Sequence, residues 1–227
     1  MAIFHVLSRG VDKRKIFLDE RDYYRFIHDL FEFNDKEPVN TTFHLFKKQY
    51  NVVRRRYIGK EEKKPRKLLV KILAFCLMPN HYHLLLEPLV ENGIPLFTKK
   101  LNGGYSRYFN ERYKRTGPLF SGKYKRILIS DEAHFIHIPY YIHLNPLDLI
   151  MPLWRNREIA DYGKAMKFLK SYRWSSHLDY FGKKNFPSVT QREFLLKFFG
   201  GHNEYKNSVK DWLQKLDVRD FKEEILE

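Results

Sequence analysis

Two histidines that alternate with a tyrosine are the first candidates for chemistry. His81 and His83 flank Tyr82 in a segment that leads from Met78-Pro79-Asn80 into a run of leucines, a pattern typical of a β-strand. Side chains alternate faces along a strand, so the two imidazoles project to the same side. Because neutral imidazole nitrogens are common ligands of divalent ions, the pair could hold one metal ion. A pair of surface histidines without a ligand is the alternative interpretation.

A second candidate is a tyrosine that lies one helical turn before an amide, in the segment Tyr140-Tyr141-Ile142-His143-Leu144-Asn145-Pro146. On a helix, three polar residues share the face of Tyr141: His134, His137 and Asn145. Tyr140 lies instead on an apolar stripe that includes Ile136, Leu144 and Leu147. The spacing therefore selects Tyr141 as the tyrosine available for polar chemistry. An amphipathic packing residue is the alternative for either tyrosine.

The elements that must position these residues follow from hydrophobic patterns. We expect a strand at residues 3–8, a helix that begins after Asp19 as its N-cap, and a hairpin of strands 68–77 and 81–86. A helix at 95–113, a strand at 124–129 and a helix from Asp131 to about Leu144 follow. The order predicts an α+β sandwich whose antiparallel sheet is covered on one face. In helix 95–113 we expect buried side chains at Leu96, Phe97, Leu101, Tyr105 and Phe109.

The basic charge of the chain is concentrated in two windows. The net charge is +15, residues 47–71 hold eleven basic and two acidic residues, and residues 99–126 hold nine basic and one acidic. Such clustering indicates a surface for a polyanion, although a solvated basic face without a partner is an alternative. The candidate DNA-binding residues are Arg9, Arg54, Arg55, Arg56, Arg107, Lys123, Lys125 and Arg126.

Composition excludes several other classes of protein. Hydrophobic residues make up 43% of the 227 residues, enough for a packed core, and no apolar run approaches the ~20 residues that span a bilayer. The single cysteine, Cys76, excludes an internal disulfide and a cysteine-rich zinc site. We therefore expect a cytoplasmic protein, since the first residues lack the pattern of a signal peptide.

The order of these motifs resembles the single-tyrosine HUH transposases, and in particular their REP-associated branch. The resemblance rests on the two segments above and covers roughly residues 3–180, without much of 36–67. The supporting segments are Phe4-His5-Val6, Ser8-Arg9-Gly10, Tyr105-Ser106-Arg107-Tyr108-Phe109-Asn110, Gly122-Lys123-Tyr124-Lys125 and Tyr172-Arg173-Trp174-Ser175-Ser176.

The resemblance implies a ferredoxin- or RRM-like α+β fold and a DNA strand transferase. His81, His83 and Asn145 would hold Mg²⁺ or Mn²⁺, although relatives can carry Gln at the third position. Tyr141 would attack single-stranded DNA that carries a hairpin or inverted repeat, and would form a 5′-phosphotyrosine bond that a 3′-hydroxyl later reverses. Residues 1–180 would form the transposase domain, with a basic insertion at 36–67 and a helical extension at 181–227. The protein would act on nucleoid DNA, as a monomer or a homodimer.

Two other functions remain open at this point. A basic α+β domain could bind structured RNA or DNA without cutting it, and would then need none of Tyr141, His81 and His83. A metal-dependent hydrolase that uses water is a weaker alternative, because no cluster of carboxylates lies beside the histidines in the sequence.

Overall fold

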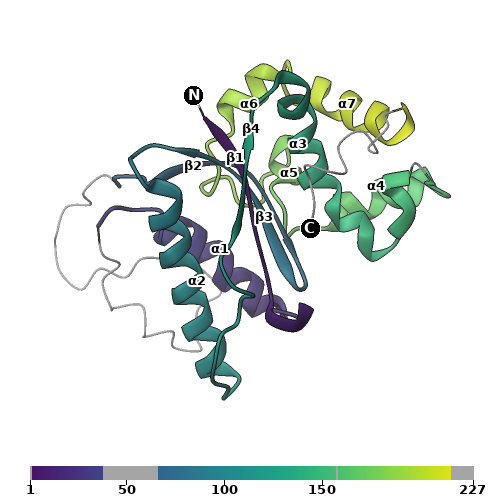
Figure 1. Ribbon diagram of the computed structural model, residues 1–227. Helices are drawn as coiled ribbons and strands as arrows, with labels where there is room; N and C mark the ends of the chain where they lie inside the picture. The colour runs from purple at the N-terminus through teal and green to yellow at the C-terminus, as the bar shows by residue number, and fades with distance from the viewer. Residues whose placement is uncertain (1, 38–65, 157, 216–227) are drawn as a thin grey trace.

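The chain folds around one antiparallel sheet (Figure 1). The computed structural model describes residues 2–37, 66–156 and 158–215. Its strands are β1 (Ile3–Arg9), β2 (Val70–Met78), β3 (His81–Pro88) and β4 (Lys125–Ile129). Its α-helices are α1 (Glu20–Glu32), α2 (Gly93–Arg112), α3 (Glu132–Leu144), α4 (Tyr162–Ser171), α5 (His177–Tyr180), α6 (Glu193–Phe198) and α7 (His202–Lys215). The described residues also form the short 3-10 helices η1 (Val11–Lys13), η3 (Asn145–Leu149) and η4 (Pro152–Asn156).

The sheet has the order β2-β3-β1-β4, and every neighbouring pair is antiparallel. With α1 between β1 and β2, and α2 between β3 and β4, the chain has the β-α-β-β-α-β arrangement of ferredoxin-like folds. The predicted α+β class is confirmed. The predicted hairpin is also confirmed: Met78 pairs with His81, and Pro79 and Asn80 form the turn.

Side-chain caps fix where two of the helices begin. The Asp19 carboxylate accepts hydrogen bonds from the backbone N–H groups of Arg21 (2.9 Å) and Asp22 (3.3 Å) at the start of α1. The Asp131 carboxylate accepts a bond from His134 N–H (2.7 Å) at the start of α3. Both caps agree with the sequence, because short acidic side chains satisfy the otherwise unpaired N–H groups of a first helical turn.

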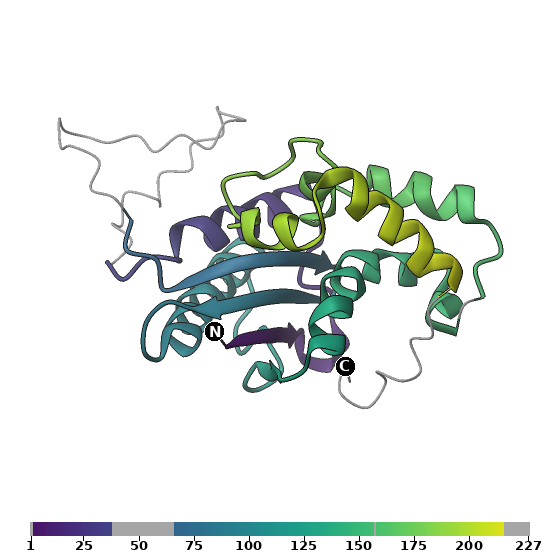
Figure 2. The same ribbon diagram turned by 90° about the horizontal axis from the view of Figure 1, so that it is seen from above.

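Helices cover both faces of the sheet, so the prediction of one covered face is wrong (Figures 1 and 2). Val6, Tyr82 and Leu84 belong to a core shared with α1 and α2. Cys76 and Leu85 face the opposite way, into a core shared with α3 and the C-terminal helices. The physical reason lies in β2 and β3, whose nearly continuous apolar runs are those of strands buried on both faces.

One residue expected in the core of α2 lies at the surface. Phe97, Leu101, Tyr105 and Phe109 are buried as predicted, but Leu96 is 46% exposed. Leu96 lies about 100° around the helix from Phe97 and about 140° from Leu101, so it falls outside the buried stripe. The apolar character of Leu96 alone gave the wrong assignment.

The C-terminal helices pack against the side of α3 that carries Tyr140. The Tyr140 ring stacks on Tyr205 of α7 at 5.5 Å between centroids and contacts Phe199 at 5.1 Å. In Figure 2, α7 lies beside α3, and the hydrogen bond from Trp212 Nε1 to His137 Nδ1 (3.1 Å) joins the two helices. No helix in the described parts of the chain has the length and apolar character needed to cross a membrane.

A cluster of buried polar side chains joins α7 to α3 and makes the stability of the fold depend on pH. The Tyr205 hydroxyl bonds to His143 Nδ1 (2.6 Å) and to His177 Nδ1 (3.1 Å), and Ser176 Oγ bonds to His143 Nε2 (2.7 Å). Burial lowers the pKa of His143 well below its ordinary value and that of His177 to about 3. Both imidazoles are therefore neutral in the folded protein at pH 5.

We expect acid to destabilise the fold through these histidines. In the unfolded chain they titrate near pH 6.5, so stability is complete above that pH and falls as the pH drops toward about 3. A single such histidine lowers the free energy of unfolding by about 2 kcal/mol between pH 7 and pH 5. Urea titrations at the two pH values measure the difference, and His177→Phe should reduce it by that amount. An equal pH dependence in His177→Phe would contradict the assignment.

Candidate functional site

Three histidines lie together on the face of the sheet that α3 covers. Along β1 and β3, Leu7 pairs with His83 and Arg9 pairs with His81, so His5, His81 and His83 share this face. The His81 and His83 rings are 4.8 Å apart between centroids. His5 stacks on His83 at 5.1 Å, and its Nε2 bonds to His83 Nδ1 at 2.9 Å. The predicted common face of His81 and His83 is confirmed, and His5 joins them as a residue outside the predicted set.

The environment keeps the imidazoles of His5 and His83 neutral. Burial is the main cause that lowers the pKa of His83 well below its ordinary value, with positive neighbours adding to it, Arg155 and Arg9 among them. Burial, followed by His134 and His81, lowers the pKa of His5 to about 3. A neutral imidazole carries a lone pair on one ring nitrogen, which is the form that binds metal ions.

The hydrogen bonds around the pair fit the donor set of a divalent metal. His81 Nδ1 lies 2.6 Å from Asn80 Oδ1, and because an amide oxygen only accepts, the proton sits on Nδ1 and the lone pair on Nε2. Among the described residues, His83 Nε2 is buried without a hydrogen-bond partner, while its Nδ1 is held by His5. One ring nitrogen oriented by a neighbour and the other left for a ligand is the usual arrangement of metal-binding histidines.

His81 and His83 would supply two ligands, which is fewer than a metal ion needs. Within residues 2–37, 66–156 and 158–215, no group of three or more His, Cys, Asp and Glu side chains is arranged to hold a metal ion. A metal held by His81 and His83 would therefore take its other ligands from an amide, from water or from a substrate phosphate. Mg²⁺ and Mn²⁺ accept such oxygen ligands readily.

Tyr141 faces the histidines and Tyr140 does not. The Tyr141 ring meets His83 edge-on at 5.8 Å between centroids and His5 at 6.0 Å, whereas Tyr140 packs against α7 on another side of α3. The structure thus confirms that Tyr141, and not Tyr140, is the tyrosine on the side of α3 that faces the histidines. Tyr141 and His83 are only 2% and 0% exposed, so other side chains cover both of them.

Asn145 lies at the end of α3, with its amide bonded to neighbouring chain segments. Its Nδ2 donates to the Tyr141 carbonyl (3.0 Å), and its Oδ1 accepts from Arg155 Nη2 (3.1 Å). Asn145 is therefore adjacent to Tyr141, as the spacing predicts. Its role as a third metal ligand stays a prediction.

Arg155 is the residue near this site that sequence reasoning missed. It lies on η4, and its guanidinium carbon is 5.4 Å from the centre of the Tyr141 ring. Its positive charge also acts on His83. Arg155 follows Asn145 by ten residues in a segment without a recognisable motif, so only the proximity of an arginine to the motif could have suggested it.

The two histidines predicted to share the face of Tyr141 separate in the structure. His134 is buried on α3 close enough to His5 to lower its pKa. His137 points away, because its Nδ1 accepts the hydrogen bond from Trp212 on α7. Residues assigned to one helical face over three turns can still point in different directions. His137 points toward α7 because of its bond to Trp212.

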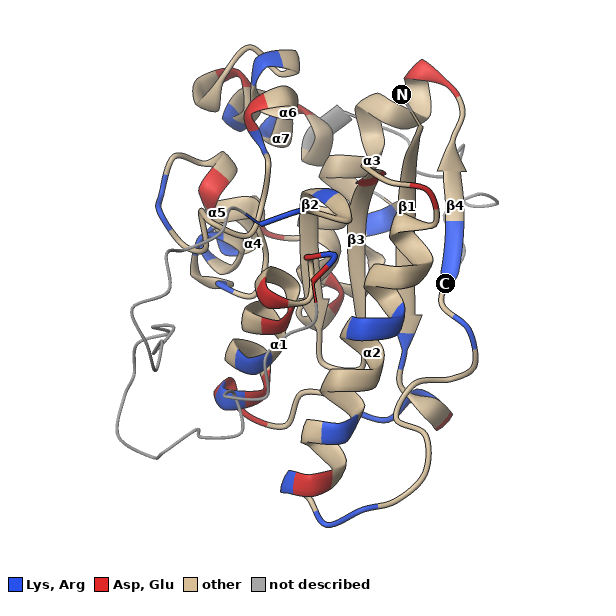
Figure 3. Cartoon of the chain, turned by 90° about the vertical axis from the view of Figure 1, so that its left-hand side faces the viewer, with Lys and Arg blue, Asp and Glu red and all other residues tan. Residues whose placement is uncertain are grey.

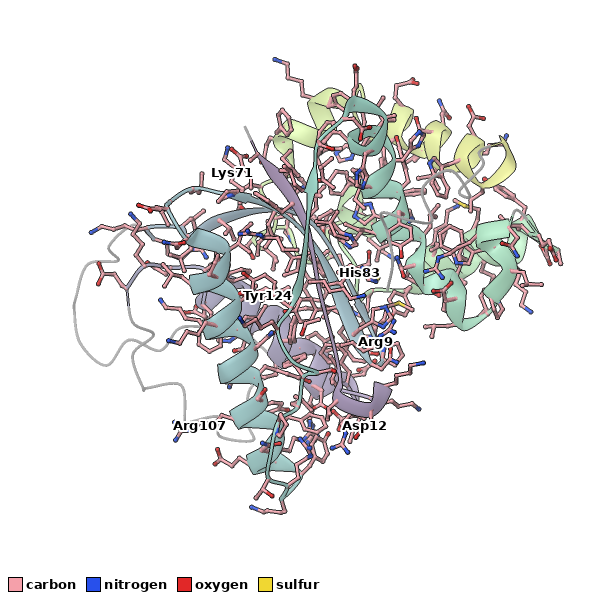
Figure 4. All side chains as sticks on the ribbon, viewed as in Figure 1. Arg9, Asp12, Lys71, His83, Arg107 and Tyr124 are labelled. Carbon is pink, nitrogen blue, oxygen red and sulfur yellow. The ribbon has the colours of Figure 1, made fainter. Side chains whose placement is uncertain are left out.

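The candidate DNA-binding residues divide between the two faces of the sheet. Arg9 lies beside His83, and Lys125 pairs with Leu7 on the same face (Figure 4). Arg126 lies on the opposite face, over the Phe4 ring at 5.0 Å, and Arg107 is exposed on α2 (Figure 4). Lys123 is exposed before β4, and Arg54, Arg55 and Arg56 lie outside the described residues. Figure 3 marks Lys and Arg positions along α2 and at the start of β4.

Comparisons with known proteins found one matching family and a similar solved structure. Residues 44–145 match the family model described as "Transposase IS200 like". A solved structure entitled "Structure of the REP associates tyrosine transposase bound to a REP hairpin" is similar at 12% identity and a TM-score of 0.39, over 66% of this chain and 68% of that chain. No curated protein matches the chain in sequence.

The family match includes His81, His83, Tyr141 and Asn145, the residues on which the resemblance rests. It begins at residue 44, within the segment interpreted as an insertion, and leaves out His5 on β1. Arg155 lies ten residues beyond its end. The predicted resemblance is confirmed to this extent: residues 44–145 are similar to the IS200-like transposases.

Proposed function

We propose that the protein is a DNA strand transferase whose nucleophile is the hydroxyl of Tyr141. The observation that carries the proposal is the position of the Tyr141 ring, which contacts His83 while His83 lies beside His81. A packing tyrosine needs no such neighbours, and a pure binding module needs neither the tyrosine nor two neutral imidazoles in contact with it. The family match supports transposition of DNA as the general activity.

The proposed step exchanges one phosphate ester for another. The Tyr141 oxygen forms a bond to phosphorus, and the bond from phosphorus to the 3′ oxygen of the preceding nucleotide breaks. The phenol gives up one proton and the leaving 3′ oxygen takes up one, so neither an oxidant nor an external energy source is required. The product is a 5′-phosphotyrosine and a free 3′-hydroxyl, and attack by another 3′-hydroxyl reverses the step and joins strands.

The residues around Tyr141 would have separate roles in this step. His81 and His83 would hold Mg²⁺ or Mn²⁺, with Asn145 as a proposed third ligand, and the bound ion would offset negative charge on the phosphate. His5 holds the His83 ring through the bond to Nδ1. Arg9 and Lys125, on the same face of the sheet, would bind the phosphate backbone of the incoming strand.

We further propose single-stranded DNA beside a hairpin as the substrate, and nucleoid DNA in the cytoplasm as the place of action. A tyrosine that is 2% exposed cannot reach into an intact duplex, whereas a flexible unpaired strand could approach it once the side chains that cover it move. The Lys and Arg residues of α2 and β4, whose positions are blue in Figure 3, would offer contacts to the phosphates of a paired stem. The stem would position the strand, because phosphate contacts fix register without reading bases.

Labelled oligonucleotides test this function and the polarity of the bond. We expect the protein with Mn²⁺ to retain label from a 3′-labelled single strand carrying a hairpin after denaturation, and to release label from the same strand labelled at its 5′ end. Retention of the 5′ label would contradict the 5′-phosphotyrosine. Tight binding without any covalent adduct, over a range of hairpins taken from the DNA that flanks the gene, would instead favour a binding module.

A further inference from the structure

Arg155 occupies a position between two aromatic rings at the end of α3. Its guanidinium carbon is 5.4 Å from the centre of the Tyr141 ring and 5.2 Å from that of Trp154. A guanidinium at this distance from a ring face is attracted by the ring quadrupole. The Arg155 side chain is 23% exposed, so this contact is partly shielded from water.

Hydrogen bonds hold the guanidinium in this position. Arg155 Nη2 bonds to Asp148 Oδ2 at 2.7 Å and to Asn145 Oδ1 at 3.1 Å. Asp148 is itself fixed, because its Oδ1 accepts from the indole Nε1 of Trp154 at 2.6 Å and Trp154 is buried. The Arg155 guanidinium therefore links the two ends of the segment 145–155 through its bonds to Asn145 and Asp148.

We propose that Arg155 is a positioning residue that holds Tyr141 and Asn145 in the geometry required for attack. One guanidinium contacts the ring of the nucleophile and fixes the amide oxygen one turn after it. The other end of that amide bonds to the Tyr141 carbonyl, so the backbone and the ring of Tyr141 are both tied to Arg155. This inference rests on the proposed function and adds to it a residue beyond the family match.

The chemistry of arginine explains why another cation would serve less well. A guanidinium is a planar fork that can bond two acceptors and lie over a ring at the same time. A lysine ammonium is a compact point charge on a flexible stem, so it could pair with Asp148 but would leave the Asn145 oxygen or the Tyr141 ring without its contact. A role that needs charge alone would be met by either side chain.

Single-turnover adduct formation with the labelled hairpin strand tests the proposal. We expect Arg155→Met to slow the maximal rate by about 10- to 100-fold, because a misplacement of about 1 Å at a reacting group has effects of this size. The DNA concentration that gives half the maximal rate should stay within about twofold of wild type, since positioning affects the reaction more than binding. Arg155→Lys should recover only part of the rate.

Two further variants control for folding and for the loss of any arginine. Asp148→Asn weakens the ion pair that holds Arg155 without changing a side chain that contacts Tyr141. Like Arg155→Met, it should slow adduct formation. Arg173→Met removes a guanidinium from over the Tyr24 and Trp174 rings, at 5.0 and 5.3 Å, and should leave the rate unchanged. Rates in Arg155→Met and Asp148→Asn equal to that of Arg173→Met would overturn the proposal.

A measurement without DNA separates this inference from the proposed function. In protein labelled with 3-fluorotyrosine, the ¹⁹F line of Tyr141 is the one missing from Tyr141→Phe. We expect Arg155→Met to shift or broaden that line and Arg173→Met to leave it in place. A changed line together with a wild-type protein that forms no adduct would reject the function and keep the positioning role. An unchanged line would reject the positioning role whatever the activity.

Discussion

Tyr141→Phe is expected to abolish the covalent protein–DNA adduct while the protein folds and binds DNA as before. The substitution removes one oxygen and keeps the ring that contacts His83 and His5 at 5.8 and 6.0 Å. Without that oxygen no bond to phosphorus can form, so the expected loss is complete rather than partial. Gel electrophoresis of denatured protein after incubation with a 3′-labelled strand measures the adduct, and a filter-binding assay measures affinity for the same strand.

The neighbouring tyrosine provides a matched control for this substitution. Tyr140→Phe makes the same chemical change one residue earlier, on the side of α3 that packs against Tyr205 and Phe199. Its cost should be one hydrogen bond, about 1 kcal/mol of stability, with adduct formation largely intact. An adduct formed by Tyr141→Phe, or lost only in Tyr140→Phe, would assign the nucleophile to the other tyrosine or to a different residue.

Local signals in the sequence predicted the elements of the fold, because each depends on neighbours within a few residues. Asp19 and Asp131 mark helix starts because a capping carboxylate acts on N–H groups two or three positions later. The alternation of His81 and His83 predicts a shared face because a strand has a period of two. The choice between Tyr140 and Tyr141 follows in the same way from the helical repeat.

Features that depend on contacts distant in sequence could not be predicted in this way. The bond between His5 and His83 joins residues 78 positions apart, and it exists only because β1 pairs with β3. His137 turns toward α7 because of Trp212, 75 positions later. The second covered face of the sheet depends on helices that follow residue 130 and return to it. None of these contacts leaves a local pattern in the sequence.

The position of Arg155 in the candidate site likewise could not be predicted from the sequence. Its partners Asn145 and Asp148 are near in sequence, but their approach depends on η3 and η4 turning back toward the end of α3. An arginine in a polar turn is ordinary for a basic chain with 42 Lys and Arg residues. The contact with the Tyr141 ring distinguishes it from the others, and a contact of that kind is visible only in the fold.

Removal of the metal, or of either histidine proposed to hold it, is expected to produce the other large loss of activity. Adduct formation should stop in a chelator and return when Mg²⁺ or Mn²⁺ is added in excess. His81→Ala and His83→Ala should each lower the rate by at least about 100-fold, since loss even of a group that only orients a metal ligand costs about 10- to 100-fold. The bond to His5 makes His83 the more sensitive position, because its loss also leaves His5 buried without that partner.

Binding of Mn²⁺, followed by electron paramagnetic resonance, tests the histidine pair without reference to activity. Wild-type protein should bind one Mn²⁺, and His83→Ala should lose that binding while it keeps a cooperative unfolding transition. His202→Ala is the matched control: that histidine lies on α7, and its Nδ1 bonds to the Tyr180 carbonyl at 2.8 Å. Since His81 and His83 supply two ligands to one ion, the double variant should bind no worse than either single variant. Unchanged Mn²⁺ binding in His83→Ala, or full activity of that variant in a chelator, would show that the two imidazoles serve Tyr141 without a metal.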